Sequence, residues 1–157
     1  AADENISEIR TIVERYPNIK LVLAHIGRCF NLKPLREGLA KLGDSVTELY
    51  FDTAAVMNPK VLEFAFDHLS ENQILFGTDF PILLWHGKRE WSETKYFNLC
   101  KEDFSWNTHK YPDQEDQYTF FVYEQIKNIL DVVFQSGNGK ELAQKVFFEN
   151  ATKVYKK

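Results

Sequence analysis

Three residues that can bind a metal ion or move a proton each follow an apolar run of the chain: His25, Asp52 and Asp79. The apolar runs predict strands buried in a parallel sheet. In parallel α/β folds ligands bind at the carboxyl ends of the strands, and in barrels the catalytic residues occupy those ends. The shared position of the three residues therefore predicts an active site at one edge of a sheet.

Asp79 has the most restricted surroundings of the three. It follows Gly77 and Thr78 and precedes Phe80 and Pro81, so a tight turn is expected to hold its carboxylate in a partly dry place. A buried charge costs several kcal/mol unless it is paired or bound to a metal. The pattern fits a catalytic metal ligand, and it fits equally an aspartate that caps the following turn through backbone N–H groups.

His25 offers an imidazole that can bind a metal, transfer a proton or polarise a carbonyl. The alternative is a histidine satisfied by a backbone carbonyl. Gly27 permits a sharp turn after it, and Arg28 can hold a substrate carboxylate through two parallel hydrogen bonds or form a surface ion pair. Asp52, which Thr53 follows, is expected to cap the next helix.

Aromatic residues gather in residues 82–117, which we interpret as an insertion or lid within the domain. Trp85 and His86 lie closest in sequence to Asp79 and are predicted to contact the substrate. The other aromatic side chains of this segment are expected to form a small core of their own; they include Trp91, Trp106 and His109. The segment has no clear periodicity, so a functional loop or short helices are expected.

The rest of the sequence alternates helices with strands. Apolar residues at helical spacing predict helices over residues 5–16, 34–42, 59–69, 118–134 and 140–155. Apolar runs between them predict strands over residues 19–26, 46–51 and 73–76. Regular alternation with short connections is typical of a parallel α/β fold, either a barrel or a doubly wound sheet.

The composition fits one soluble globular domain, with 157 residues of which 44% are hydrophobic and 27% charged. A net charge of −4 disfavours nucleic-acid binding, which requires a clustered basic surface. No apolar run approaches the roughly 20 residues of a membrane span, and the polar N-terminus lacks the features of a signal peptide. Cys29 and Cys100 are expected to be free thiols of a cytoplasmic protein.

These motifs resemble the amidohydrolase superfamily, in particular the branch that contains aminocarboxymuconate semialdehyde decarboxylase and related decarboxylases and hydrolases. Residues 23–27 (Leu-Ala-His-Ile-Gly) are similar to the end of the sixth barrel strand in that branch, and residues 50–54 (Tyr-Phe-Asp-Thr-Ala) to the end of the seventh. Residues 77–81 (Gly-Thr-Asp-Phe-Pro) resemble the end of the eighth strand closely, and residues 146–151 resemble the final helix. Most of residues 82–117 has no counterpart.

The resemblance implies a TIM-like (β/α)8 barrel with a divalent metal, most commonly zinc, that hydrolyses or decarboxylates a small carboxylated or cyclic molecule. Asp79 would be the metal ligand of the eighth strand and His25 the catalytic histidine of the sixth. Residues 1–157 would then be a single partial-barrel domain. It would contain about strands six to eight with their helices, the aromatic-rich insertion and two C-terminal helices.

In this family the first strand carries His-x-His and the fifth a further ligand, and neither is present in this sequence. A full barrel needs about 250 residues, and the chain starts at Ala1 with Met57 as its one methionine, so we expect a piece of a longer protein. Its metal site would be incomplete and the piece inactive. Self-association or the missing N-terminal half would cover the open strand edge. The alternatives are a non-catalytic α/β domain for assembly or partner binding, and a small flavodoxin-like domain, which the lack of a phosphate loop disfavours.

Overall fold

The structure, a computed structural model, describes residues 3–100 and 117–156. Its centre is a parallel sheet with the strand order β1-β2-β3, formed by Leu21–Leu23, Leu49–Asp52 and Ile74–Leu75. Leu21 pairs with Leu49 and Phe51 pairs with Ile74 in parallel register, so the carboxyl ends of the strands lie at one edge. The predicted alternation of helices with parallel strands is confirmed for this part of the chain.

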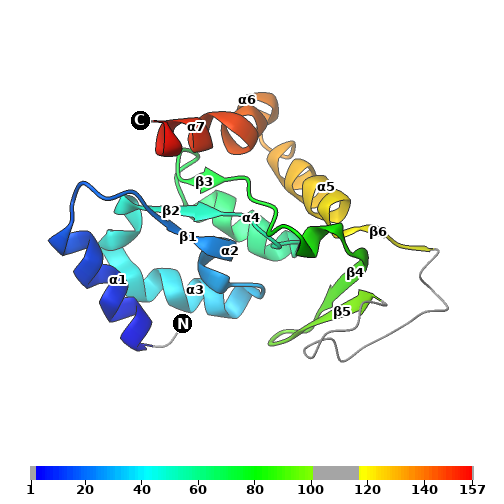
Figure 1. Cartoon of the computed structure of the whole chain (residues 1–157), viewed down its shortest axis with the longest axis horizontal. Helices are drawn as coiled ribbons and strands as arrows, with labels where there is room; N and C mark the ends of the chain where they lie inside the picture. The colour runs from blue at the N-terminus through cyan, green and yellow to red at the C-terminus, as the bar shows by residue number, and fades with distance from the viewer. Residues whose placement is uncertain (1–2, 101–116, 157) are drawn as a thin grey trace.

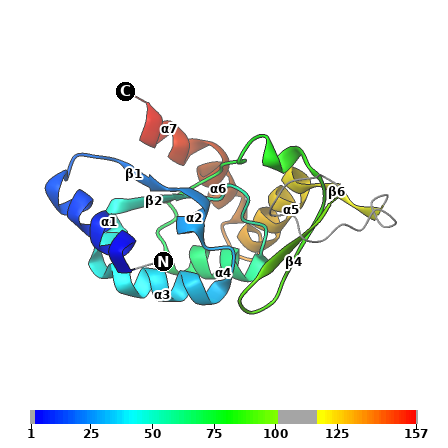
Figure 2. The same cartoon turned by 60° about the horizontal axis from the view of Figure 1, so that its bottom comes forward.

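Three helices accompany the sheet at the predicted positions. α1 (Asp3–Arg15) precedes β1, α3 (Leu32–Leu42) joins β1 to β2, and α4 (Pro59–His68) joins β2 to β3. Both views place α1 and α3 below the strands (Figures 1 and 2). The start of α4 has a local cause, because Asn58 Oδ1 accepts a hydrogen bond from Lys60 N at 3.1 Å and a proline follows the cap.

The chain ends in helices, of which α7 (Asn150–Tyr155) lies above the strands in both views (Figures 1 and 2). After α5 (Phe121–Val133), α6 (Gly139–Gln144) runs through a π-helical turn (Lys145–Glu149) into α7. The backbone carbonyl of Val146 accepts a hydrogen bond from Phe76 N at 2.9 Å, which ties the π-helical turn to the end of β3. None of the helices described is long and apolar enough to cross a membrane.

One hydrophobic cluster joins the sheet to both sets of helices, and each large side chain buried in it contributes about 1.5–3 kcal/mol. Its fully buried members include residues of β2, β3 and the helices: Leu35, Leu49, Phe51, Val61, Leu62, Ile74, Ile129, Val133 and Val146. β1 differs, because all three of its residues remain partly exposed, whereas the sequence predicted burial on both faces. β1 is an edge strand of the sheet in the described chain, with a neighbour on one side.

The strands are also shorter than predicted. β1 ends at Leu23, because the backbone enters a left-handed turn, α2 (Ala24–Arg28), at the residues expected to continue it. Residues predicted to begin the second strand belong instead to a 3-10 helix, Gly43–Glu48. The ends of these strands are set by backbone geometry at the two edges of the sheet, which the spacing of apolar residues cannot predict.

Three buried amide side chains donate to backbone carbonyls around the short strands. Gln73 Nε2 donates to Leu49 O at 2.7 Å and to Val46 O at 2.6 Å. Buried carbonyls need donors as much as buried side chains need neighbours. The other two amides do the same: Asn150 Nδ2 donates to Glu71 O and Ile74 O, and Gln125 Nε2 to Thr53 O and Gly77 O.

The segment after β3 forms an antiparallel sheet in the order β5-β4-β6, from Tyr96–Cys100, His86–Trp91 and Thr119–Phe120. The sequence predicted a loop or short helices here, and Ile82–Leu84 forms one short 3-10 helix. The two inward residues of β4 are Gly87 and Arg89, so the strand shows no alternation of apolar with polar side chains. Figures 1 and 2 place the β4–β5 hairpin on the side opposite α1. Trp106 and His109 lie outside the described residues.

We expect Gly87→Ala to lower the free energy of unfolding by about 1–3 kcal/mol, the usual cost of overpacking. A Cβ at residue 87 would lie 2.5 Å from Leu99 O and 2.7 Å from Cys100 Cβ. Gly38, inside α3, is the matched control, since a Cβ there meets no atom within 4 Å. Gly38→Ala should stabilise by about 0.5–1 kcal/mol. Urea unfolding followed by circular dichroism measures both, and a stabilising Gly87→Ala would contradict the close packing of the hairpin.

Candidate active site

The carboxyl ends of the parallel strands carry strained backbone. In the described chain five non-glycine residues have positive φ angles. They are His25 (57°), Ile26 (49°) and Arg28 (59°) after β1, Ala55 (51°) after β2 and Asp79 (57°) after β3. Such conformations cost on the order of 1–3 kcal/mol each and gather at catalytic and binding sites. This edge of the sheet is therefore the candidate active site.

Asp52 holds two of these strand ends together. Its Oδ1 accepts hydrogen bonds from His25 N at 2.8 Å and from Ala54 N at 3.0 Å. Hydrogen bonds to an ionised acceptor are the stronger kind. The carboxylate therefore supplies an acceptor for two backbone N–H groups that have no partner in the sheet once the chain turns. The sequence predicted that Asp52 caps the next helix. Asn58 caps α4 instead, and Asp52 caps the turn directly after β2.

The ring of His25 is oriented by the same loop. Its Nδ1 lies 2.8 Å from the backbone carbonyl oxygen of Ala54. Because a carbonyl oxygen can only accept, Nδ1 carries the proton and donates it. Nε2 is then the nitrogen available for a proton, a substrate or a metal ion. The backbone and the side chain of His25 are thus both held by the segment that follows β2.

The carboxylate of Asp79 is engaged differently. In the described chain it accepts no hydrogen bond, and the turn after it is closed by Ile82 N, which donates to the backbone oxygen of Asp79 at 2.9 Å. The alternative that this carboxylate caps the turn therefore has no support in the geometry. An aspartate in a left-handed conformation with an uncommitted carboxylate is available to a ligand.

A cavity of about 630 Å³ brings three of the predicted site residues together, since His25, Arg28 and Asp79 all line it. The hairpin contributes further side chains to the same cavity: Arg89, Tyr96, Phe97 and Asn98. Charged, hydrogen-bonding and aromatic groups therefore meet around a space that suits a small molecule.

Trp85 and His86 do not line this cavity. The Trp85 ring stands edge-on to Phe121, with centroids 6.3 Å apart, beside a second buried cluster. The His86 ring makes a T-shaped contact with Phe120 at 5.3 Å. Nearness to Asp79 in sequence thus does not place these two side chains beside it, and their predicted contact with substrate stays a prediction.

Arg89 was not predicted from the sequence and is the most buried charged side chain of the cavity, with 4% of its surface exposed. Its Nε donates to Asn98 Oδ1 at 2.8 Å and its Nη1 to Ala55 O at 2.5 Å. Burial lowers the pKa of Arg89 to about 10, an effect that Tyr96 and Asp79 oppose, so the side chain remains a cation at neutral pH. Nothing in the local sequence separates Arg89 from its neighbour Lys88, which is exposed.

In the described part of the chain no three His, Cys, Asp or Glu side chains are grouped so as to hold a metal ion. Catalytic zinc usually has three protein ligands and one open position. His25 and Asp79 offer two donor groups to one cavity. The described residues therefore fit part of a metal site and do not complete one.

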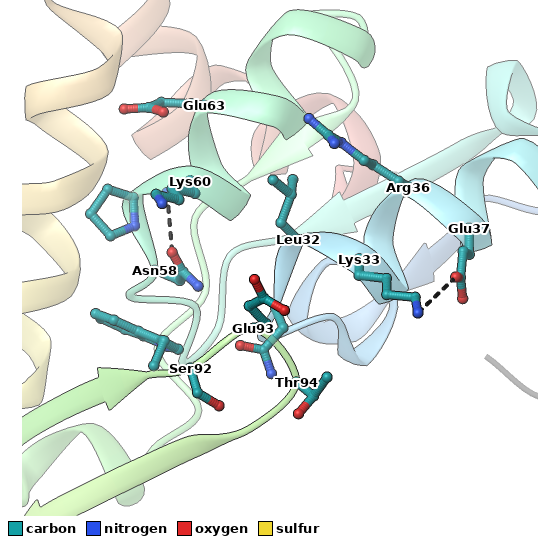
Figure 3. A pocket seen from close by; sticks show the side chains of 13 residues that line it. Leu32, Lys33, Arg36, Glu37, Asn58, Lys60, Glu63, Ser92, Glu93 and Thr94 are labelled. Atoms are coloured by element: carbon teal, nitrogen blue, oxygen red, sulfur yellow. Dashed lines mark hydrogen bonds and ion pairs between the residues drawn. The ribbon is translucent and has the colours of Figure 1, made fainter.

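A larger cavity of about 1070 Å³ lies between the first turns of α3 and α4 and the hairpin tip (Figure 3). Charged residues of both signs line it: Lys33, Arg36, Glu37, Lys60, Glu63 and Glu93. Lys33 and Glu37 approach to 3.9 Å, and both side chains are more than half exposed. Balanced, solvated charges select neither an anion nor a cation, so the larger volume does not mark the better candidate site.

We expect Asp52→Ala to lower the free energy of unfolding by about 1.5–3 kcal/mol, because two backbone N–H groups lose a charged acceptor. Asp67 is a suitable control, since it is exposed on α4. Asp67→Ala should change stability by less than about 0.5 kcal/mol. Chemical unfolding of both variants measures the difference, and equal effects would contradict the role given to Asp52.

An amidohydrolase family model matches residues 3–157. The 6-methylsalicylic acid decarboxylase of Penicillium expansum is 34% identical over 83 residues, which cover 45% of this chain and 26% of that protein. The chain thus spans about a quarter of the length of this curated relative, and no solved structure matches it. The predicted resemblance is confirmed, and the chain belongs to the amidohydrolase family.

Proposed function

We propose that the chain forms about strands six to eight of a (β/α)8 barrel in a metal-dependent amidohydrolase-type enzyme. Its substrate would be a small carboxylated or cyclic molecule. The observation that carries the proposal is the meeting of His25 and Asp79 in one cavity, at strained ends of parallel strands. Barrels of this kind keep their catalytic residues at those ends.

The unfinished sheet supports the barrel part of the proposal. Among the strands described, β1 has one neighbour, and its residues are half-exposed. An apolar groove of about 290 Å³ lies beside it, lined by residues of β1, α1 and α3 such as Leu23, Ile6 and Leu39. An open strand edge beside apolar surface invites pairing. A preceding barrel strand in a longer chain would cover it, and self-association is the alternative.

His25 would act through Nε2, because its Nδ1 is committed to Ala54 O. When protonated, the ring presents an N–H that stabilises negative charge developing on a substrate. When neutral, the lone pair of Nε2 can take up a proton or bind a metal. The hydrogen bond to Ala54 O fixes the ring orientation, so Nε2 keeps one direction in either role.

Asp79 would be the metal ligand contributed by the last strand, and in a hydrolytic reaction it would take the proton of the attacking water. A bound zinc ion supplies a Lewis acid and a water that ionises near neutral pH. The other ligands would come from parts of the barrel outside the described residues, since His25 and Asp79 are two donors where about three are usual.

Similarity to the curated relative favours decarboxylation, because that protein is named a decarboxylase of 6-methylsalicylic acid, an aromatic acid. That reaction releases CO₂ and places a proton on the carbon that carried the carboxyl group. A site for it must hold a carboxylate and deliver a proton. Positively charged Arg28 and Arg89 meet the first need in this cavity, and His25 or Asp79 can meet the second.

In the intact protein we expect Asp79→Asn to lower kcat by at least about 100-fold and to lower the content of bound metal. The amide keeps the size of the side chain and removes its charge and basicity. Turnover of an aromatic carboxylic acid and elemental analysis of the purified protein measure the two effects. Asp67→Asn serves as the control on α4. Normal turnover with normal metal content in the Asp79 variant would refute the assigned role.

We expect the 157-residue chain by itself to bind zinc weakly, because its described residues complete no group of three ligands. Titration calorimetry with zinc chloride measures the affinity. A stoichiometric site with a dissociation constant below about 1 μM, which corresponds to about 8 kcal/mol, would show that the chain completes the site unaided.

A further inference from the structure

We propose that Arg89 is the specificity-determining residue of this site, and that its guanidinium binds the carboxylate of an aromatic acid. The inference rests on the proposed function and deepens it by naming the group that recognises the substrate. It concerns a residue of the hairpin and not of the strand ends.

The first support is a buried cation that forms no ion pair in the described part of the chain, although Asp79 lines the same cavity and acts on it from beyond ion-pair distance. Arg89 is 4% exposed, and in the part of the chain that the structure describes no carboxylate lies within ion-pair distance of it. Keeping an unpaired charge out of water costs several kcal/mol. A protein that retains such a group in a cavity provides a strong site for an anion, because attraction is larger where water does not screen it.

The second support is the way in which the guanidinium is held. Its hydrogen bonds to Asn98 Oδ1 and Ala55 O fix the plane of the group through Nε and Nη1. Aromatic rings surround it, with centroids 4.8 to 5.5 Å from its central carbon; they belong to Phe30, Tyr96 and Phe121. Nη2 donates to no atom of the described chain, so a ligand can supply its acceptors. A pre-oriented planar donor suits a carboxylate.

The third support is the balance of charge in the cavity. Its lining includes two arginines and one aspartate, a formal excess of positive charge in a chain whose net charge is −4. Phe30, Tyr96 and Phe97 add aromatic faces to the same lining. Arg28 is exposed and therefore screened by solvent. Arg89 is the cation whose position and surroundings favour an anionic aromatic ligand.

A structural role for Arg89 is the competing explanation, because the residue also joins the hairpin to the loop after β2. The two roles differ in their dependence on ligand charge. We would measure binding of benzoate and of neutral benzamide to the intact protein by titration calorimetry. In Arg89→Met the dissociation constant of benzoate should rise by about 10- to 100-fold, while that of benzamide changes less than threefold. Arg89→Lys keeps the charge without the planar donor and should give an intermediate rise.

Arg36→Met is the matched control. Arg36 also stacks on an aromatic ring, 5.1 Å from the centroid of Phe64, but it is exposed and lines the other cavity. It should leave both affinities within twofold. Equal weakening of benzoate and benzamide in Arg89→Met would assign Arg89 a structural role and overturn the proposal.

A second measurement decides the matter if Arg89→Met does not fold. In protein labelled with ¹⁵N-arginine, the Nε–H resonance of Arg89 is identified by its loss in Arg89→Lys. Benzoate should shift that resonance in the wild-type protein and benzamide should not, and an unmoved resonance at saturating benzoate would overturn the inference. These binding readouts need no turnover, so they can be separated from the test of Asp79. If benzoate binds selectively but the Asp79→Asn variant keeps full activity, the proposed chemistry alone is refuted. Metal-dependent turnover with affinities insensitive to Arg89 would refute this inference alone.

Discussion

The carboxylate of Asp52 is the contact on which the candidate site depends. One oxygen accepts the N–H of His25 from the first strand end and the N–H of Ala54 from its own. The loop placed in this way then turns the Ala54 carbonyl toward His25 Nδ1. Asp52 therefore fixes both the backbone turn and the ring of His25 without lining the cavity. Asp52 thus supports the candidate site by positioning neighbouring residues, although an aspartate could also take part in chemistry directly.

Strain at the strand ends has to be offset elsewhere, since five left-handed residues would relax in an isolated peptide. Gln125, fully buried on α5, donates to Thr53 O and Gly77 O and so fastens the loops after β2 and β3 to a helix. The hydrophobic cluster that joins the same helix to the sheet contributes further. The helices thus stabilise the loop conformations that carry the candidate site, and Gln125 does so through hydrogen bonds to backbone carbonyls of those loops.

Features of the fold could be predicted from the sequence where burial determines the type of residue at each position. Apolar runs located the parallel strands and the polar residues after them, because burial leaves a mark on residue type. They did not locate β4, whose inward positions are Gly87 and Arg89. Nearness to Asp79 in sequence predicts substrate contact for Trp85 and His86, which stays a prediction. It does not predict the short helix and the new sheet that begin there, or the ring contacts of the two residues with Phe121 and Phe120. The burial of Arg89 is a tertiary fact, and its neighbours in sequence are exposed.

The two walls of the cavity come from structures with different constraints. His25, Ala55 and Asp79 stand at the ends of a sheet whose core tolerates little change in volume. Arg89, Tyr96 and Asn98 stand on a hairpin that packs on a second, smaller cluster, which also contains Ala55 and Met57 from the loop after β2. In the proposed function, the groups that would move protons thus stand at the strand ends, while the group that would select the ligand stands on the hairpin. Arg89 links the two parts, because its Nη1 donates to the backbone oxygen of Ala55 and its guanidinium lies 5.4 Å from the centroid of the Phe30 ring. The hydrogen bond uses the backbone of Ala55, while the Ala55 side chain is buried in the smaller cluster, so residue 55 serves both the left-handed turn and the packing of the hairpin.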